Sequence, residues 1–393
     1  MEKIDYTYTP VKKKELDEII KIVSDALLVP PTEYKKVRQW LETEGIDSMR
    51  AVRDVDTLVG GVQMVPWGHF YGGKSVPAVG ISFVGVRPEY RRMGAASFMM
   101  NECVREIYRE GYAVSTLYPA NIPLYRRSGY EVAHRSQVYE LNPSKILVRS
   151  HDCKMERVDK SSLDILKDIY WKFASATNGN IDRNESFWTW IFEPIWDKHR
   201  DVYIISYEGK PEGYAVVTVR DIDKPLKLRD YAATTHRAAL RLITFLADHS
   251  SLVKKIKFIA GPGDPVIDCS PEWMLDVKDI CNVMLRIVNV KSALEQRGYQ
   301  KFLDGEVHFE IEDDIVPENN GNWILSVKKG RGRCKQGGKG SIEIDIRQLA
   351  QLYSCYFYGT DFLVNSSIKA TKKDIEHASV IFSGPSPWMR DDF

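Results

Sequence analysis

The stretch FVGVRPEYRRMGAASFMM joins a strand pattern to a helix pattern through two arginines and one glycine. The first turn of a helix leaves backbone N–H groups without partners and carries partial positive charge. Arg91 and Arg92 add two guanidinium groups there, and Gly94 lets a ligand approach the backbone closely. Ala95 and Ala96 keep the helix entrance open. The turn is therefore predicted to bind an anion, which we interpret as a pyrophosphate.

Two common phosphate-binding patterns are absent from this turn. A dinucleotide-binding fold would show G-x-G-x-x-G, and a P-loop would end in G-K-[ST]. Instead, R-x-x-G-x-A on Arg91, Gly94 and Ala96 follows the strand-like segment SFVGV. In this context the pattern resembles the acyl-CoA-binding motif of the GNAT acetyltransferases. The resemblance implies that acetyl-CoA is bound by Val84, Val86, Arg91, Arg92, Gly94, Ala95 and Ala96.

The strand before the turn has its own role in that family. It offers backbone groups to the pantetheine arm, much as a peptide adds to a sheet edge. Val84 and Val86 occupy this strand here. Both valines also suit a strand with one face in the core, and the two interpretations are compatible because the implied contact uses backbone atoms.

A second motif, LYRRSGYEV, follows some thirty residues later and resembles the LYxxxGF element of the same family. Leu124, Tyr125, Gly129 and Tyr130 match it. The resemblance places Tyr125 near the sulfur of CoA, as a general acid for the departing thiolate. The alternative is a core aromatic residue beside a turn.

The length and composition of the chain are typical of a soluble protein with two or three domains. The chain has 393 residues, a formal net charge of +1, 44% hydrophobic and 28% charged residues. A net charge this close to zero creates no overall electrostatic field that would attract nucleic acid or a membrane, and we expect neither as a partner. Six scattered cysteines without a CxxC pair argue against a disulfide framework and against a metal site. With no signal-peptide pattern at the start, we expect a cytoplasmic protein.

Helix and strand patterns recur in the same order along the chain. Two helices, antiparallel strands, a helix and a strand are predicted before residue 148 and again between residues 149 and 285. The second copy has TTHRAALRL where the first has its glycine turn, so Thr235, His236 and Arg237 would obstruct a cofactor. We therefore expect a GNAT acetyltransferase domain over 1–148 and a degenerate GNAT-like domain over 149–285.

Residues 286–393 differ, with strands joined by polar turns and with short helices. We interpret them as a separate α+β domain that resembles sterol carrier proteins. The basic segment KKGRGRCKQGGKG has no aromatic residue among its charges, which favours a solvated hairpin tip over nucleic-acid binding. The predicted fold class is thus mixed α/β: tandem GNAT folds, each with a mixed central sheet flanked by helices, plus this α+β domain.

This architecture and the ending WMRDDF resemble the Eis family of amine acetyltransferases. The resemblance implies that the terminal carboxylate, here on Phe393, takes a proton from the substrate ammonium or anchors it. A free α-carboxyl has a pKa of roughly 3.5. Burial and the adjacent Asp391 and Asp392 are expected to raise that pKa. The alternative is a frayed tail.

The acceptor pocket is expected to combine negative charge with flat surfaces. The resemblance implies substrate contacts from Trp40, Ser82 and Asp392, and the alternative for Trp40 is a core position on an amphipathic helix. Aminoglycoside acetylators of the family carry an acidic residue just before a VPP loop; here Asp25 lies too early, and Glu33 is the possible substitute. His69, near a hairpin tip, is expected on the surface.

These observations lead to one functional hypothesis and two alternatives. The hypothesis is an acetyl-CoA-dependent N-acetyltransferase acting on primary amines of a small polycation, such as an aminoglycoside. A protein-lysine or polyamine acetyltransferase is the alternative among enzymes. A lipid-binding or scaffold protein with a vestigial GNAT unit is the alternative outside them, motivated by the third domain. Family members assemble as hexamers, so the resemblance also implies a homo-oligomer.

Overall fold

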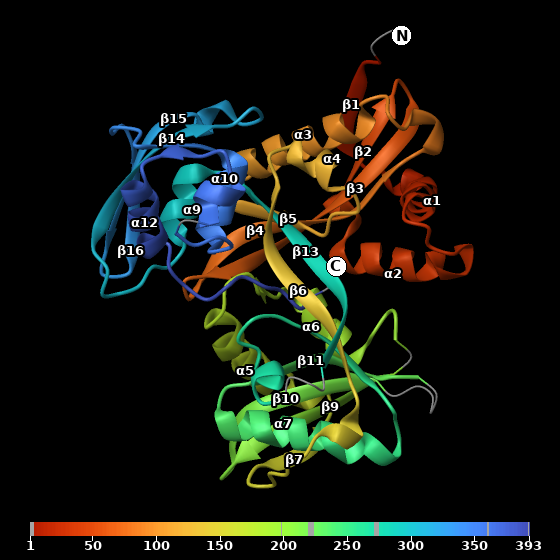
Figure 1. Ribbon diagram of the computed structural model, residues 1–393. Coiled ribbons are helices and arrows are strands. Elements are labelled where there is room, and N and C mark those ends of the chain that lie inside the picture. Colours follow the sequence, from red (N-terminus) through yellow and green to blue (C-terminus); the bar gives the residue numbers. More distant parts are fainter. Residues whose placement is uncertain (1–3, 198, 219–223, 271–274, 360, 392) are drawn as a thin grey trace. The chain divides into compact units, whose positions relative to one another are not determined.

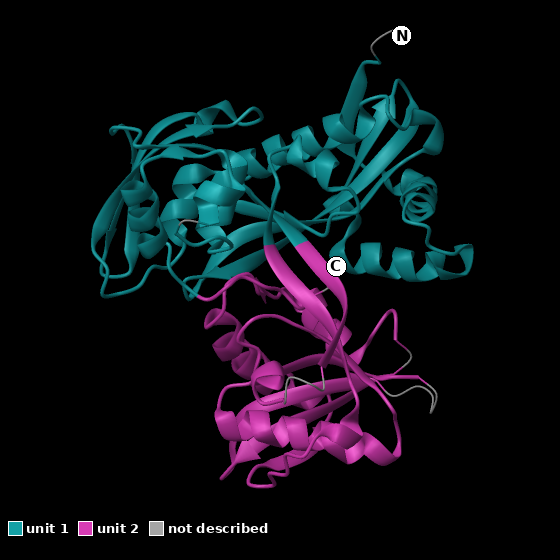
Figure 2. Ribbon diagram, in the orientation of Figure 1, with its two compact units in different colours: residues 1–133, 283–384, 393 teal, residues 134–282, 385–392 magenta. Residues whose placement is uncertain are grey.

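The computed structural model describes residues 4–197, 199–218, 224–270, 275–359, 361–391 and 393 (Figure 1). They group into two compact units, coloured separately in Figure 2. Unit 1 contains residues 1–133, 283–384 and 393, and unit 2 contains residues 134–282 and 385–392. Each unit combines helices with β-sheet, as the predicted mixed α/β class requires.

The first sheet of unit 1 has its strands in the order β1 (Tyr6–Pro10), β2 (Met49–Asp54), β3 (Thr57–Tyr71), β4 (Lys74–Val86), β5 (Val114–Leu117) and β13 (Leu275–Ile287). Neighbouring strands are antiparallel except for the parallel pair β4–β5. Its helices are α1 (Leu16–Ala26), α2 (Tyr34–Glu44), α3 (Ala95–Arg109) and α4 (Ile122–Arg126). Helix α3, which the sequence predicts, buries Met99, Cys103 and Ile107 in the core beside this sheet.

Strand β4 changes partners along its length. It pairs with β5 only from Ala78 to Ile81. Just beyond, Phe83 and Val84 stand opposite the single residue Val62 of β3, and Phe83 has φ +49°. This is a β-bulge, which bends the strand and locally redirects its side chains. The end of β4 thus has no ladder with β5, and this is the segment in which the cofactor strand was predicted.

The remainder of unit 1 is an α+β domain with a second sheet. Its strands lie in the order β16 (Arg331–Gln336), β15 (Gly321–Lys328), β14 (Gly305–Glu312), β17 (Ile342–Asp345) and β18 (Lys369–Ala370). Its helices are α9 (Val290–Gln296), α10 (Ile346–Ser354), α11 (Asp361–Asn365) and α12 (Lys372–Ile381). The basic segment forms the β15–β16 hairpin with exposed lysines at its turn, as predicted.

The tip of the β3–β4 hairpin packs against this domain. Gly298 N donates a 3.0 Å hydrogen bond to Tyr71 O, and a Cβ added to Gly72 would lie 2.0 Å from the Gly298 carbonyl oxygen. The expected surface position of His69 is therefore wrong. The ring is fully buried, and its Nε2 lies 2.8 Å from Thr116 Oγ1.

The sheet of unit 2 has its strands in the order β6 (Glu131–Leu141), β12 (Ile256–Ala260), β11 (Leu226–Ala233), β10 (Lys210–Thr218), β9 (Asp201–Tyr207) and β7 (Lys154–Val158). The remaining elements are α5 (Leu163–Ser175), α6 (Glu185–Phe192), α7 (His236–Asp248), α8 (Pro265–Asp268) and the short β8 (Ile181–Asp182). Apolar residues of α7, among them Leu242 and Leu246, pack with the strands into a second core.

Two strands explain why the units are not continuous in sequence. Strand β6 follows the first acetyltransferase-like segment, yet Gln137–Leu141 pair with β12 in unit 2. Strand β13 follows the second segment, yet Met284–Ile287 pair with β5 in unit 1. The predicted boundaries at 148 and 285 describe segments of sequence and stay predictions.

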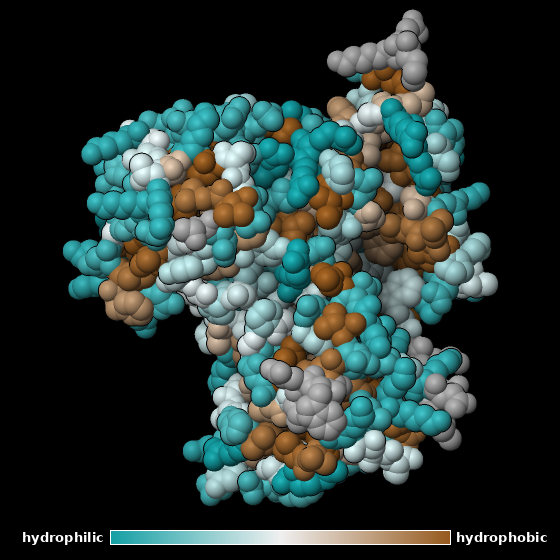
Figure 3. Space-filling view, viewed as in Figure 1, coloured by the Kyte–Doolittle hydropathy of each residue, from teal (hydrophilic) through white to brown (hydrophobic). Residues whose placement is uncertain are grey.

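The surface and composition add three observations. On the face shown in Figure 3, hydrophobic residues gather in separate groups among hydrophilic ones. No helix among the described residues has both the length and the apolar character needed to cross a bilayer. All six cysteines are free thiols, and no three His, Cys, Asp or Glu side chains of the described chain are placed to share a metal ion.

The glycine of the LYRRSGY motif is required for two reasons. Gly129 has φ +79°, and a Cβ there would lie 2.8 Å from the guanidinium carbon of Arg286. Arg286 is itself fully buried and donates to both carboxylate oxygens of Asp313 at 2.7 Å. Gly129→Ala should therefore combine backbone strain with displacement of a buried ion pair, whose disruption costs about 3–5 kcal/mol.

Gly111→Ala is the matched control, because Gly111 has φ +84° but open space around its α-carbon. We expect this substitution to lower the free energy of unfolding only through backbone strain, by about 1–2 kcal/mol. Thermal unfolding of both variants measures the difference. Equal losses of thermal stability would show that the contact with Arg286 contributes nothing at Gly129.

Candidate active site

A cavity of about 720 Å³ opens beside the end of β4 in unit 1. Its walls come from β4, from the turn before α3, from the first turn of α3 and from α4. All of the predicted cofactor-binding residues line it: Val84, Val86, Arg91, Arg92, Gly94, Ala95 and Ala96. Tyr125 lines the same cavity. The structure thus brings together two motifs that lie some thirty residues apart in sequence.

The start of α3 has backbone donors available at this cavity. Gly94 is the N-cap residue with φ +92°, and no side chain caps the helix. The first hydrogen bond to Gly94 O comes from the amide of Phe98, so the amides of the preceding turn have no intrahelical acceptor. Ala95, Ala96 and Ser97 of that turn line the cavity. This arrangement suits an anion.

The cavity is also strongly positive. Three guanidinium groups line it, on Arg91, Arg92 and Arg127, while none of its described lining residues is Asp or Glu. None of the three arginines forms an ion pair with a described carboxylate. Arg127 was missed at the sequence level. The signal was the pair of arginines in LYRRSGY, of which only Arg127 lines this cavity, because Arg126 binds Glu131 at 2.7 Å.

Tyr125 is held by a short, well-capped helix. The side chain of Asn121 accepts a hydrogen bond from Leu124 N at the start of α4. The Tyr125 side chain is buried, and its ring packs edge-on against Tyr130 with centroids 6.4 Å apart. Burial raises the pKa of Tyr125 to about 12. The phenol therefore keeps its proton throughout the physiological range.

Two of the predicted substrate contacts meet at one buried amide. Trp40 Nε1 and Ser82 Oγ both donate to Gln63 Oε1, at 3.0 and 2.9 Å. Gln63 Nε2 in turn donates to Ser48 Oγ at 3.1 Å. Trp40 is 6% exposed and Ser82 is 7% exposed, so they offer little surface to a ligand. Asp392, the third predicted contact, lies outside the described residues.

Phe393 packs on two aromatic residues of unit 1. Its ring lies edge-on to Trp67, with centroids 4.5 Å apart, and to Tyr118, with centroids 5.4 Å apart. Trp67 in turn lies over Gly80 of β4, where a Cβ would come within 1.7 Å of the indole ring. Tyr118 directly follows β5.

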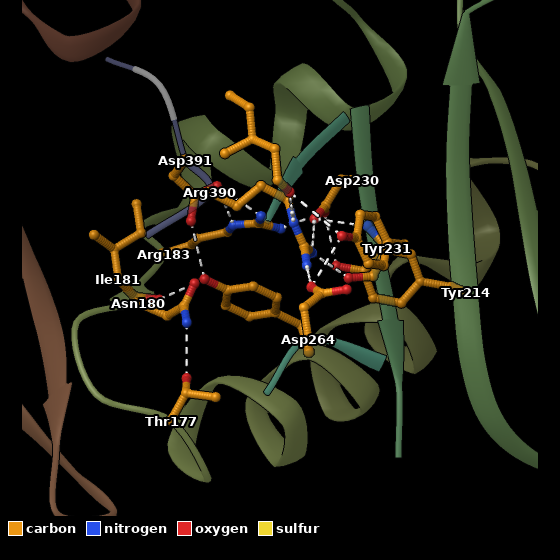
Figure 4. A network of polar contacts seen from close by, with 12 residues as sticks. Thr177, Asn180, Ile181, Arg183, Tyr214, Asp230, Tyr231, Asp264, Arg390 and Asp391 are labelled. Carbon is orange, nitrogen blue, oxygen red and sulfur yellow. Dashed lines mark hydrogen bonds and ion pairs between the residues drawn. The ribbon is translucent and has the colours of Figure 1, made fainter. Parts of the chain in front are cut away.

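The residues just before the end of the chain pack into unit 2. Trp388 and Met389 are fully buried, and Trp388 N donates to Asn178 O at 3.0 Å. Figure 4 shows Arg390 directed at Asp230 and Asp264, and Arg183 lying between Asp230 and Asp391. Within the described residues 385–391, a frayed tail is therefore the wrong interpretation.

This network also contains Asp391, which was expected to help raise the pKa of the terminal carboxyl. Its carboxylate accepts from Arg183 Nε at 2.9 Å and from Tyr170 OH at 3.0 Å. Such a neutralised carboxylate neither repels the terminal carboxylate strongly nor offers charge to a substrate. Burial alone would raise the pKa of Asp230, but Arg183 and Arg390 lower it.

The helix of unit 2 that corresponds to α3 begins very differently. Thr235 caps α7 by accepting from Ala238 N, and Thr235 Oγ1 donates to Glu212 Oε2 at 2.6 Å. Arg237 Nε donates to the same carboxylate at 2.7 Å, and its guanidinium lies 3.6 Å from the centre of the Tyr207 ring. The start of α7 thus has a side-chain cap and an arginine paired with a carboxylate, whereas α3 has no side-chain cap and its arginines have no carboxylate partner among the described residues.

Family models match most of the chain. Acetyltransferase (GNAT) domain models match residues 7–133 and residues 179–287, and a sterol carrier protein domain model matches residues 290–390. These matches confirm the predicted fold class of tandem GNAT domains followed by a sterol-carrier-like domain.

Individual relatives agree with the family models. N-acetyltransferase Eis of Mycobacterium tuberculosis is 28% identical over 304 residues, 71% of each chain. The crystal structure of a GCN5-related N-acetyltransferase from Anabaena variabilis is 31% identical, with a TM-score of 0.94 over 99% of this chain and 100% of that one. Eis1 from Mycobacterium abscessus shares the fold at 21% identity, with a TM-score of 0.80 over 99% of this chain and 100% of that one. The chain is therefore an Eis-like N-acetyltransferase of the GCN5-related (GNAT) family.

Proposed function

We propose that this enzyme transfers an acetyl group from acetyl-CoA to a primary amine of a small polycation, such as an aminoglycoside. The observation that carries the proposal is the cavity beside β4, which has three unpaired guanidinium groups and no described carboxylate. Such a cavity suits a ligand with several phosphate groups. The end of β4, which has no ladder with β5, lies in its wall.

In this proposal the donor spans the cavity from the start of α3 to Tyr125. The first-turn amides of α3, with Arg91 and Arg92, bind the pyrophosphate. Backbone groups at Val84 and Val86 bind the pantetheine arm as an added strand would. Gly94 provides the left-handed conformation from which the helix begins. Acetyl-CoA supplies the activated acetyl group as a thioester.

Tyr125 is the proposed acid for the departing thiolate. Its pKa of about 12 exceeds that of an ordinary thiol, about 8.5, by roughly 3.5 units. Full transfer of its proton would therefore cost about 5 kcal/mol in the resting site. Hydrogen-bond donation to the developing negative charge costs no such transfer. We assign Tyr125 this donor role, with the proton following as the sulfur leaves.

The Phe393 carboxylate is the proposed base or anchor for the substrate ammonium. An ammonium must lose a proton before its nitrogen can attack the thioester. The contacts of the Phe393 ring with Trp67 and Tyr118 restrict the position of this residue, which supports the assignment. With a pKa of roughly 3.5, an α-carboxylate holds an ammonium more readily than it deprotonates one.

The acceptor is proposed to bind beside Trp40 and Ser82, which their shared hydrogen bonds to Gln63 hold in place and which border the site with the small surface that they expose. Asp392 is the proposed anionic contact. Glu33, the possible substitute for the family's acidic residue, pairs with Lys36 at 3.0 Å. That pairing partly offsets the charge that Glu33 could offer, and a polyamine or protein lysine is the alternative acceptor.

Three further expectations belong to the proposal. By family resemblance we propose a homo-oligomer, a hexamer, in the cytoplasm. We also propose that the second GNAT domain binds no CoA, because Thr235 caps the start of α7 and Glu212 binds Arg237 there. In the sterol-carrier-like domain, the buried guanidinium of Arg297 packs among Tyr299, Tyr353 and Phe382, which disfavours lipid binding there.

The direct test is CoA release from acetyl-CoA with aminoglycosides, polyamines and a lysine peptide as acceptors. Tyr125→Phe should lower kcat roughly 10²–10⁴-fold, as expected for loss of a general acid. A chain lacking Phe393 should lose turnover because the ammonium is no longer held or deprotonated. Tyr108→Phe is the control, because Tyr108 lies on α3 outside the cavity.

The acceptor that supports turnover in this panel names the substrate class. Turnover that survives deletion of Phe393 would remove this residue from catalysis. Equal activity of wild type and Tyr125→Phe would show that the Tyr125 hydroxyl is not the general acid.

The raised pKa of Tyr125 also predicts the pH dependence of kcat. An acid loses activity above its pKa, so a pKa of about 12 predicts no decline due to Tyr125 between about pH 8 and about pH 10. An unperturbed tyrosine, with pKa about 10, would already be half ionised at the upper end. Profiles of kcat for wild type and Tyr125→Phe measure this. A wild-type alkaline decline that disappears in Tyr125→Phe would contradict it.

A further inference from the structure

Arg127 lies where two cavities of unit 1 meet. It lines the 720 Å³ cavity and also a second cavity of about 380 Å³. The side chain is exposed and forms no ion pair or hydrogen bond within the described chain. An exposed arginine without a partner at the edge of a cationic cavity is free to bind a ligand group.

The second cavity carries both signs of charge, because Arg126, Arg127 and Arg347 line it together with acidic residues. It is lined by four carboxylates, of which Asp313 binds Arg286 and Asp345 binds Arg347. The carboxylates of the other two, Glu312 and Asp314, form no ion pair or hydrogen bond within the described chain. The first cavity, with three arginines and no carboxylate among its described lining residues, therefore suits a polyanion better than the second. Arg127 is the arginine of the first cavity that also borders the second.

The proposed donor, acetyl-CoA, has three phosphates, whereas the turn before α3 is proposed to bind only two of them. Acetyl-CoA carries two phosphates in its pyrophosphate and a third on the ribose 3′ position. The start of α3, with Arg91 and Arg92, is matched to the pyrophosphate. Arg127 comes from a different element, just after α4, and is the remaining guanidinium of the cavity. Its planar fork of N–H donors fits a terminal phosphate bidentately.

We propose that Arg127 binds the ribose 3′-phosphate of acetyl-CoA and sets the enzyme's preference for the phosphorylated donor. This proposal rests on the proposed function, because it assumes that acetyl-CoA occupies the larger cavity. Arg127 is then a specificity-determining residue that contacts the donor far from the reacting bond.

The test compares two donors, acetyl-CoA and acetyl-3′-dephospho-CoA, which differ only in that phosphate. Wild type should use acetyl-CoA with a KM about tenfold lower, as expected for one charge-assisted hydrogen-bonded contact at an exposed site. In Arg127→Gln the two KM values should become equal, through a rise in the KM of acetyl-CoA alone. Arg127→Lys should retain part of the discrimination, because it keeps the charge and loses the fork.

Arg126→Gln is the neighbouring control, since Arg126 lines only the second cavity and binds Glu131. It should keep the wild-type ratio of the two KM values, which does not depend on the amount of folded enzyme. The proposal is overturned by a wild type that does not distinguish the donors. It is equally overturned by an Arg127→Gln variant that weakens both donors alike or leaves the ratio unchanged. If wild type used neither donor, the proposed function would fail first.

Discussion

The separation of β4 from β5 is the constraint on which the site depends. Their ladder ends at Ile81 and Leu117, and the bulge at Phe83 and Val84 follows at once. A closed ladder would leave no room for the cavity and no unpaired strand edge beside it. The bulge lies shortly before β4 ends at Val86, and the turn with Arg91 and Arg92 follows. The uncapped start of α3 and the end of this strand line the same cavity.

Much of this site was predictable because its parts are local in sequence. A strand, a cationic turn with glycine and a helix start are encoded within about twenty residues, and helix-start physics predicts an anion site there. Tyr125 needed one further motif. Arg127 could not be selected over Arg126 from sequence, because the choice depends on which of two adjacent side chains finds Glu131. Likewise, nothing local showed that Trp40 and Ser82 would bind the same glutamine.

The fold was predictable where elements contact their sequence neighbours, and less so where distant segments pair. Strand β13 has an exposed first half and a buried second half, so it lacks the regular alternation that indicates a strand. Its pairing with β5 completes the sheet of a domain that begins more than 250 residues earlier. His69 was misplaced for the same reason. A hairpin tip is normally solvated, but here the domain that begins near α9 covers it.

The contacts of Glu212 at the start of α7 have a consequence for redesign of the second domain. Because Thr235 and Arg237 both bind Glu212 there, one substitution would not free the helix start. Removing Glu212 would leave Arg237 stacked on Tyr207, and Thr235 would still cap the helix. Each intermediate would lose an internal contact before gaining an external one. Opening the start of α7 to a ligand would therefore take several substitutions together.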